Sequence, residues 1–149
     1  MILNQQRAVR LARRPLEHFL RRLQRELDLH ESGVTIALVS DAEIARMNET
    51  FRKKKGPTDV LSFPAAARRS PRTLPRATSK QKAAEFLGDI AIAPATARRY
   101  ARKHGRTLPA ELRVLILHGV LHLMGYDHET DRGEMNRVER KLRKRFGLA

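Results

Sequence analysis

The sequence contains no cysteine and no tryptophan, and aromatic residues make up only 5% of its 149 residues. Without cysteine the chain can form neither a disulfide nor a thiolate metal site, which leaves histidine and carboxylate side chains as metal ligands. The small number of aromatic rings also disfavours extended stacking on nucleic-acid bases. Any metal centre in this protein must therefore be built from histidine and acidic residues.

A long apolar segment is also missing. No apolar run approaches the roughly 20 residues that a helix needs to span a bilayer. The first residues, Met1–Asn4, are not followed by the apolar stretch of a secretory signal. We therefore expect no membrane association and a cytoplasmic location.

Acidic residues are scarce relative to basic ones. The chain has 16 Asp and Glu against 31 Lys and Arg, a formal net charge of +15. Such a surplus on one small domain indicates a polyanionic partner, because cationic side chains that bind a phosphate backbone release its counterions. A highly charged but inert surface is the alternative interpretation.

The spacing of apolar residues predicts a single α+β domain over residues 1–149. Apolar positions three and four residues apart indicate helices, and β-branched apolar runs indicate short strands. We expect a small mixed sheet of about four strands packed with about five helices, and a long basic loop over 65–84. The helices are expected over 15–27, 41–51, 94–105, 107–124 and from Thr130 to Phe146, and the strands over 34–40, 59–63 and 87–93, with Ile2 and Leu3 beginning a fourth.

Three histidines near the end of the apolar helix over 107–124 predict a metal site. His118 and His122 are four residues apart, so a helix places both imidazoles on one face. Gly125 ends the helix, and the turn that follows can return His128 as a third ligand. Three nitrogen ligands with an open position are typical of catalytic zinc, so we expect one Zn²⁺ per chain at the end of this buried helix. The other histidines, His18, His30 and His104, are expected to be solvated.

The same histidine spacing is found in metallopeptidases with the pattern HExxHxxGxxH. Those enzymes need a glutamate directly after the first histidine as general base, and this chain has Gly119 there. A metallopeptidase is therefore the less favoured hypothesis.

The block from His118 to His128, HGVLHLMGYDH, closely resembles the signature of the YbeY family of metal-dependent endoribonucleases. Two further blocks are similar in the same order, at 48–64 (NETFRKKKGPTDVLSFP) and at 87–90 (LGDI). A closing helix with Met135 and Glu139 also fits the family. The chain departs from the family at 52–55, where the usual Arg-Gly-Lys-Asp is Arg-Lys-Lys-Lys.

This resemblance implies a zinc-dependent endoribonuclease specific for single-stranded RNA. It implies a role in maturation of the 3′ end of small-subunit rRNA and in ribosome quality control, with the small ribosomal subunit as a partner. His118, His122 and His128 would be the zinc ligands, and Arg52 would be the functional arginine. The planar fork of Arg52 can hold a phosphate and neutralise charge in the transition state, and Lys53, Lys54 and Lys55 would follow the RNA backbone.

Three further side chains are also candidates for a role at the site. Asp127 can orient a histidine ligand or cap the turn, and Tyr126 can stack on a base or cover the metal helix. Asp89 stands between apolar strand residues, so we expect it to be buried with a hydrogen-bond partner. A ribosome-associated RNA-binding protein with a structural metal remains the main alternative, and a fourth protein ligand would favour it.

Overall fold

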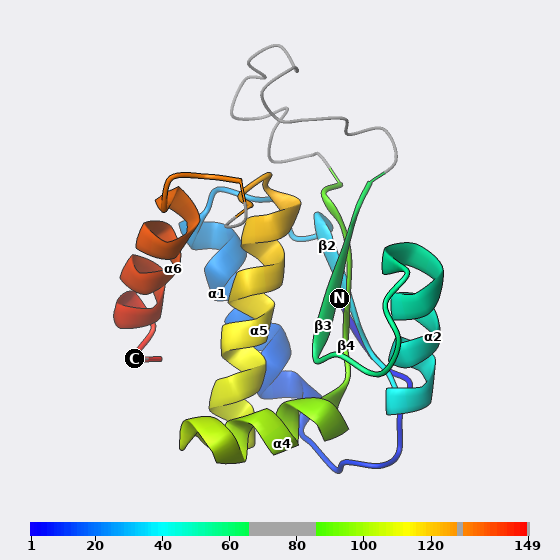
Figure 1. The fold of residues 1–149 in the computed structure, drawn as a ribbon. Helices are drawn as coiled ribbons and strands as arrows, with labels where there is room; N and C mark the ends of the chain where they lie inside the picture. Colours follow the sequence, from blue (N-terminus) through cyan, green and yellow to red (C-terminus); the bar gives the residue numbers. More distant parts are fainter. Residues whose placement is uncertain (66–85, 128–129, 149) are drawn as a thin grey trace.

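Four short strands form one mixed sheet at the centre of the fold (Figure 1). The computed structural model describes residues 1–65, 86–127 and 130–148. Strands β1 (Ile2–Asn4), β2 (Val34–Leu38), β3 (Val60–Pro64) and β4 (Gly88–Ile92) lie in the order β1-β2-β4-β3. The first three strands in that order are parallel, and β3 pairs antiparallel with β4. The predicted mixed sheet, including a strand that begins at Ile2, is confirmed.

Five helices within the described ranges cover the two faces of this sheet. Helix α2 lies on one face, whereas α1 and α5 lie on the other, with α4 and α6 packed beside them (Figure 1). None of these helices combines the length and apolar character needed to cross a membrane. The predicted α+β architecture is confirmed. The bounds of the helices are α1 (Arg13–Glu26), α2 (Asp41–Arg52), α4 (Pro94–His104), α5 (Leu108–Leu123) and α6 (Glu134–Arg145).

Most element boundaries agree with the predictions, but the start of α6 differs. We expected this helix to follow Thr130, and it begins at Glu134. The carboxylate of Asp131 accepts hydrogen bonds from the backbone N–H groups of Gly133 (2.8 Å) and Met135 (2.9 Å). These bonds satisfy donors of the first helical turn and so set the starting point of α6. The predicted basic loop lies outside the described residues, apart from Ala65.

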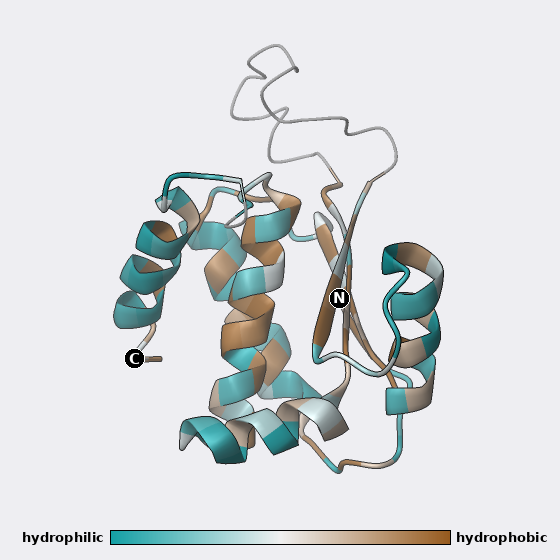
Figure 2. Cartoon of the chain, in the orientation of Figure 1, coloured by the Kyte–Doolittle hydropathy of each residue, from teal (hydrophilic) through white to brown (hydrophobic). Residues whose placement is uncertain are grey.

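Helix α5 passes through the main hydrophobic core. Its side chains Leu112, Ile116, Leu117 and Leu121 are almost completely buried against α1 and the sheet. Figure 2 shows brown, apolar colour along α5 and the strands, and mostly teal, polar colour on α6. Because α5 is apolar on nearly every side, its position in the core is fixed, and so are the polar side chains near its end.

The start of strand β4 requires glycine. Gly88 has a φ of +146°, and a Cβ atom there would lie 2.3 Å from the carbonyl oxygen of Phe63 on the paired strand. Gly105 ends α4 with a φ of +66°, but a Cβ atom there meets nothing within 4 Å. An L-residue would be strained at both positions. Of the two, only Gly88 also lacks space for a Cβ atom, because the Phe63 carbonyl oxygen occupies it.

We predict that Gly88→Ala destabilises the protein more than Gly105→Ala. The second change should cost about 1–2 kcal/mol, the usual penalty for an L-residue in a left-handed conformation. The first adds a backbone clash, which should cost roughly 2 kcal/mol more. Urea unfolding followed by circular dichroism measures both. Equal losses for the two variants would show that the close approach of Gly88 to Phe63 does not limit stability.

Candidate functional site

The carboxyl-terminal half of α5 and the edge strand β3 form the walls of an open cleft of about 570 Å³. The hydroxyl of Ser62 on β3 donates to the carbonyl oxygen of Gly119 on α5 at 3.4 Å, which joins the two walls. The end of α2 contributes one arginine to the same cleft. The lining residues are Arg52, Thr58, Asp59, Val60, Leu61, Ser62, Pro64, His118, His122, Gly125, Tyr126 and Asp127.

The two histidines of α5 point toward each other in this cleft. The Nε2 atoms of His118 and His122 lie 3.0 Å apart, and the ring planes meet at 73° with centroids 4.6 Å apart. Both side chains are half-buried. The predicted convergence of the two imidazoles is therefore present, and a metal ion at the usual Zn–N distance of about 2.0–2.1 Å could contact both nitrogens.

A carboxylate from α6 orients the first of these histidines. Glu139 Oε1 lies 2.8 Å from Nδ1 of His118. Because a carboxylate accepts, Nδ1–H donates this hydrogen bond, and in the neutral ring the lone pair is then on Nε2, the atom closest to His122. This is the tautomer that a metal ligand needs. The sequence placed Glu139 on the closing helix but gave no sign of the contact, because the two residues are 21 positions apart.

The third predicted ligand, His128, lies outside the described residues. Among those that are described, no group of three His, Asp or Glu side chains is arranged to hold a metal. The donor set that is described, two neutral imidazole nitrogens with one ring fixed by a carboxylate, fits zinc chemistry. The carbonyl of Asp127 accepts from the backbone N–H groups of Thr130 (3.2 Å) and Asp131 (3.0 Å).

Arg52 is the last residue of α2, and it is exposed at the edge of the cleft. The chain turns sharply after it, because Lys53 adopts a left-handed conformation with a φ of 55°. The buried side chain of Asn48 donates to the carbonyl oxygen of Gly56 at 3.1 Å, which anchors the other end of the turn. The structure therefore brings Arg52 to the histidines. The lysines at 53–55 are exposed and do not line the cleft.

Asp59 is a cleft residue to which we gave no role from the sequence. Burial raises the pKa of its carboxyl, while the backbone N–H groups of Asp59 and Val60 offset part of this effect. Among nearby charges, Glu111 raises the same pKa and His118 lowers it. The sequence offered one sign of this cleft residue, an acidic side chain directly before the apolar run VLSF. An acid in that position more often caps a turn.

One expectation about a polar side chain was wrong. Asp89 is exposed rather than buried, because strand alternation places it on the sheet face that α2 covers incompletely. His104 is exposed, as expected, and its Nδ1 also lies 3.0 Å from Oε1 of Glu111. Glu111 is only 2% exposed, and Arg106 also binds it at 2.9 Å. His104 and Arg106 therefore stabilise a buried carboxylate near the start of α5. His18 and His30 are exposed, as expected.

Gly119 is enclosed by the sheet. A Cβ atom at this position would lie 2.8 to 3.2 Å from three side-chain carbons of Ile90, which is itself buried. The glutamate that a metallopeptidase needs after its first histidine therefore has no space here. This packing adds a steric reason to the chemical argument against a peptidase.

Comparisons with known proteins agree with this geometry. The family model described as "Endoribonuclease YbeY" matches residues 1–147. The endoribonuclease YbeY of Solibacter usitatus is 43% identical over 143 residues, which cover 95% of this chain and 85% of the relative. That of Koribacter versatilis is 37% identical over 148 residues, 99% of this chain and 86% of the relative. The solution structure of TM1509 from Thermotoga maritima has a TM-score of 0.61 and 28% identity, covering 99% of this chain and 90% of that one.

These matches identify a hydrolase that acts on RNA. The chain belongs to the YbeY family of endoribonucleases. The resemblance inferred from the histidine block is thus confirmed, and the +15 charge has an RNA substrate as its counterpart.

We predict that Asp59→Asn stabilises the metal-free protein at pH 7 and that this gain disappears below about pH 4. The folded pKa of Asp59 is raised above its ordinary value of 3.8. The protonated carboxyl of Asp59 is the form that the fold favours. Its contribution to stability is complete below that value and is lost as the pH rises through the folded pKa, where the buried carboxyl must ionise. Asparagine keeps a hydrogen-bond acceptor for Val60 but cannot ionise.

Chemical denaturation with a chelator present, at pH 3.5 and pH 7, measures this difference. Glu31→Gln removes an exposed carboxylate and serves as the control. A gain from Asp59→Asn that is as large at the lower pH would show that burial of the charged form is not its source.

Proposed function

We propose that this protein is a zinc-dependent endoribonuclease specific for single-stranded RNA. We propose further that it acts in the cytoplasm on the 3′ end of small-subunit rRNA and in ribosome quality control, with the small ribosomal subunit as partner. The observation that carries the metal-dependent part is the 3.0 Å approach of the His118 and His122 Nε2 atoms inside the cleft that Arg52 lines.

The metal would be held by His118 and His122 together with the predicted ligand His128. A bound zinc ion would supply a Lewis acid that polarises a phosphoryl oxygen or an attacking water. Glu139 keeps Nδ1 of His118 protonated and its ring in place, so Nε2 remains available as a ligand. The cleft has a volume of about 570 Å³ and is open to solvent, so an RNA strand could enter it.

Arg52 would bind the phosphate at the cleavage position. Its guanidinium is always charged, and its planar fork can contact two phosphate oxygens at once. The charge that develops on these oxygens during cleavage makes the interaction stronger in the transition state than in the ground state. Lys53, Lys54 and Lys55 extend the positive charge along the turn beyond the cleft and would contact the neighbouring phosphates.

We predict that His118→Ala loses both bound zinc and RNA cleavage, whereas Arg52→Ala loses cleavage alone. The arginine variant should cleave about 10²–10³-fold more slowly, the usual effect of removing one group that stabilises transition-state charge. Elemental analysis of zinc and gel assays on a labelled single-stranded RNA provide the two measurements. His18→Ala, which removes an exposed histidine of α1, is the control and should change neither.

These variants separate the competing functions. Normal cleavage by Arg52→Ala would remove the arginine from the mechanism. Loss of folding rather than of activity alone in His118→Ala, together with four protein ligands on the metal, would favour a binding protein with a structural zinc. Because contaminating ribonuclease affects all preparations alike, the difference between variants decides the outcome.

We also predict that Glu139→Ala weakens zinc binding by about 10–100-fold, the usual effect of removing a group that orients a metal-binding histidine. Glu139→Gln should have a smaller effect, because the amide oxygen can still accept from Nδ1–H. A competition titration with a chromogenic chelator measures the affinity without reference to activity. Glu49→Gln on the exposed side of α2 is the control. Unchanged affinity in Glu139→Ala would show that the hydrogen bond does not serve the metal site.

A further inference from the structure

Helices α1 and α6 carry an unusual share of the positive charge. Five arginines and two glutamates lie on α1, and six basic and two acidic residues lie on α6. The two helices therefore hold a surplus of seven charges, almost half of the net +15, on 26 of the 149 residues. Nine of these eleven basic residues are arginines, the side chain best suited to bidentate contact with phosphate.

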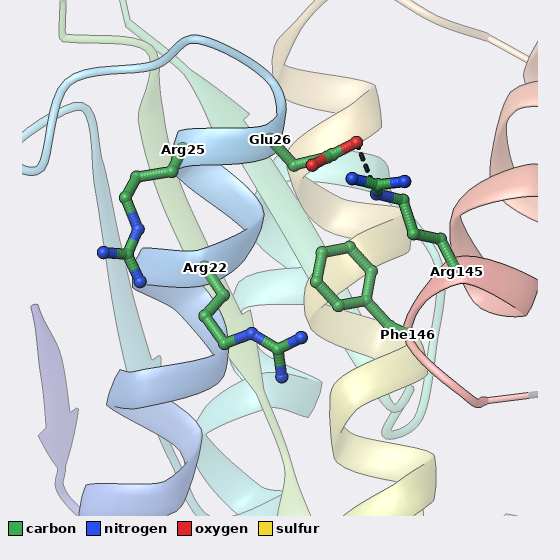
Figure 3. A pocket seen from close by; sticks show the side chains of 5 residues that line it. All are labelled: Arg22, Arg25, Glu26, Arg145 and Phe146. Carbon is green, nitrogen blue, oxygen red and sulfur yellow. Dashed lines mark ion pairs between the residues drawn. The ribbon is translucent and has the colours of Figure 1, made fainter.

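A hollow of about 430 Å³ lies where α1 and α6 meet, and Figure 3 shows the side chains around it. Three of the lining residues are Arg22, Arg25 and Arg145, against a single acid, Glu26. Arg145 binds Glu26 with an Nε–Oε1 distance of 2.6 Å, and the guanidinium of Arg22 lies 5.2 Å above the centre of the Phe146 ring. Two of the three arginines are therefore held in place around the hollow.

A second hollow, of about 580 Å³, lies on α6. It is lined by Asn136, Glu139, Arg140, Arg143 and Lys144. Glu139 also contacts His118, which lines the cleft, so one hydrogen bond links the lining of this hollow to that of the cleft. Beyond Glu139, positive charge continues along α6 from Arg140 through Arg143 and Lys144 to Arg145 at the first hollow.

From this arrangement we propose that the α1–α6 surface is a second RNA-binding site, which holds the phosphodiester backbone of the substrate outside the cleft. By α1–α6 surface we mean the residues that line these two hollows. The proposal deepens the RNA-directed activity by adding a site that distinguishes long from short RNA. A strand that extends from the cleft would meet Arg140, Arg143 and Lys144 first and the arginines of the first hollow next.

The composition of the surface favours a polyanion over a protein partner. Protein interfaces depend on buried apolar and aromatic anchors. Among the described residues, the large apolar side chains that are exposed are Met1, Leu3, Phe51, Phe86 and Tyr100, and none of these belongs to α1 or α6. Arg22 covers one side of the Phe146 ring, so that ring contributes to fixing an arginine rather than to stacking on a base.

The test compares two triple variants that each remove three positive charges. Arg25→Ala/Arg143→Ala/Lys144→Ala changes both hollows without touching the cleft. Arg98→Ala/Arg102→Ala/Lys103→Ala removes exposed charges from α4 and is the matched control. Both are made in the full chain, with a further His118→Ala change for the binding measurements so that the RNA stays intact.

Fluorescence anisotropy gives the affinity for a single-stranded RNA of about 30 nucleotides, longer than the 4–16 nucleotides of a typical single-strand site. We expect the α1–α6 variant to bind it roughly tenfold or more weakly, and the slope of log K against log salt to decrease by about 2, or about 0.7 for each lost phosphate contact. The α4 variant should lose much less. Cleavage of an RNA of about six nucleotides by the α1–α6 variant with His118 intact should equal that of wild type.

Several results would overturn the proposal. An equal loss of affinity in the α4 variant would show a general effect of net charge, and unchanged affinity in the α1–α6 variant would show no RNA contact there. Tighter binding of poly-glutamate than of RNA, lost in the α1–α6 variant, would assign the surface to an acidic protein. RNA affinity is measured with protein that carries His118→Ala, and cleavage is measured with protein that keeps His118. Failure of the proposed zinc-dependent cleavage is therefore distinguishable from failure of the proposed second RNA-binding site.

Discussion

The rest of the site depends on the burial of α5. Fully burying a Leu or Ile side chain stabilises a fold by about 1.5–3 kcal/mol, and four such residues of this helix are almost completely buried. Rotation of α5 about its axis would expose several of them, so the orientation of its remaining polar face is set by the core. His118 and His122 lie on that face, and their 3.0 Å approach follows from apolar packing on the other sides.

Strong positive charge is compatible with this fold because the charges lie away from the core. Net charge far from zero weakens the compact state through self-repulsion. The buried carboxylate of Glu111 offsets part of this repulsion, because Arg106 and His104 both bind it near the start of α5. This arrangement fixes the helix at one end, while Glu139 contacts it near the other end. Two acids thus position the helix that carries the histidines.

Local patterns predicted the features that depend on neighbours in the sequence. Helical spacing placed His118 and His122 on one face. The start of α2 is likewise set by neighbours in the chain, since the hydroxyl of Ser40 accepts from the Glu43 N–H. Contacts between distant residues were not predictable in this way. The partners of His118 and Glu111 come from another helix or from the preceding turn, and chain spacing does not encode them. Asp89 was misjudged because apolar neighbours in a strand do not reveal how far a helix covers its face.

Helix α6 connects the two sites that we propose. The same twelve-residue helix supplies the carboxylate that fixes the tautomer of His118 and six basic side chains that face solvent or line the hollows. The proposed metal site and the proposed second RNA-binding site would therefore share one helix, which sets their distance along a bound strand.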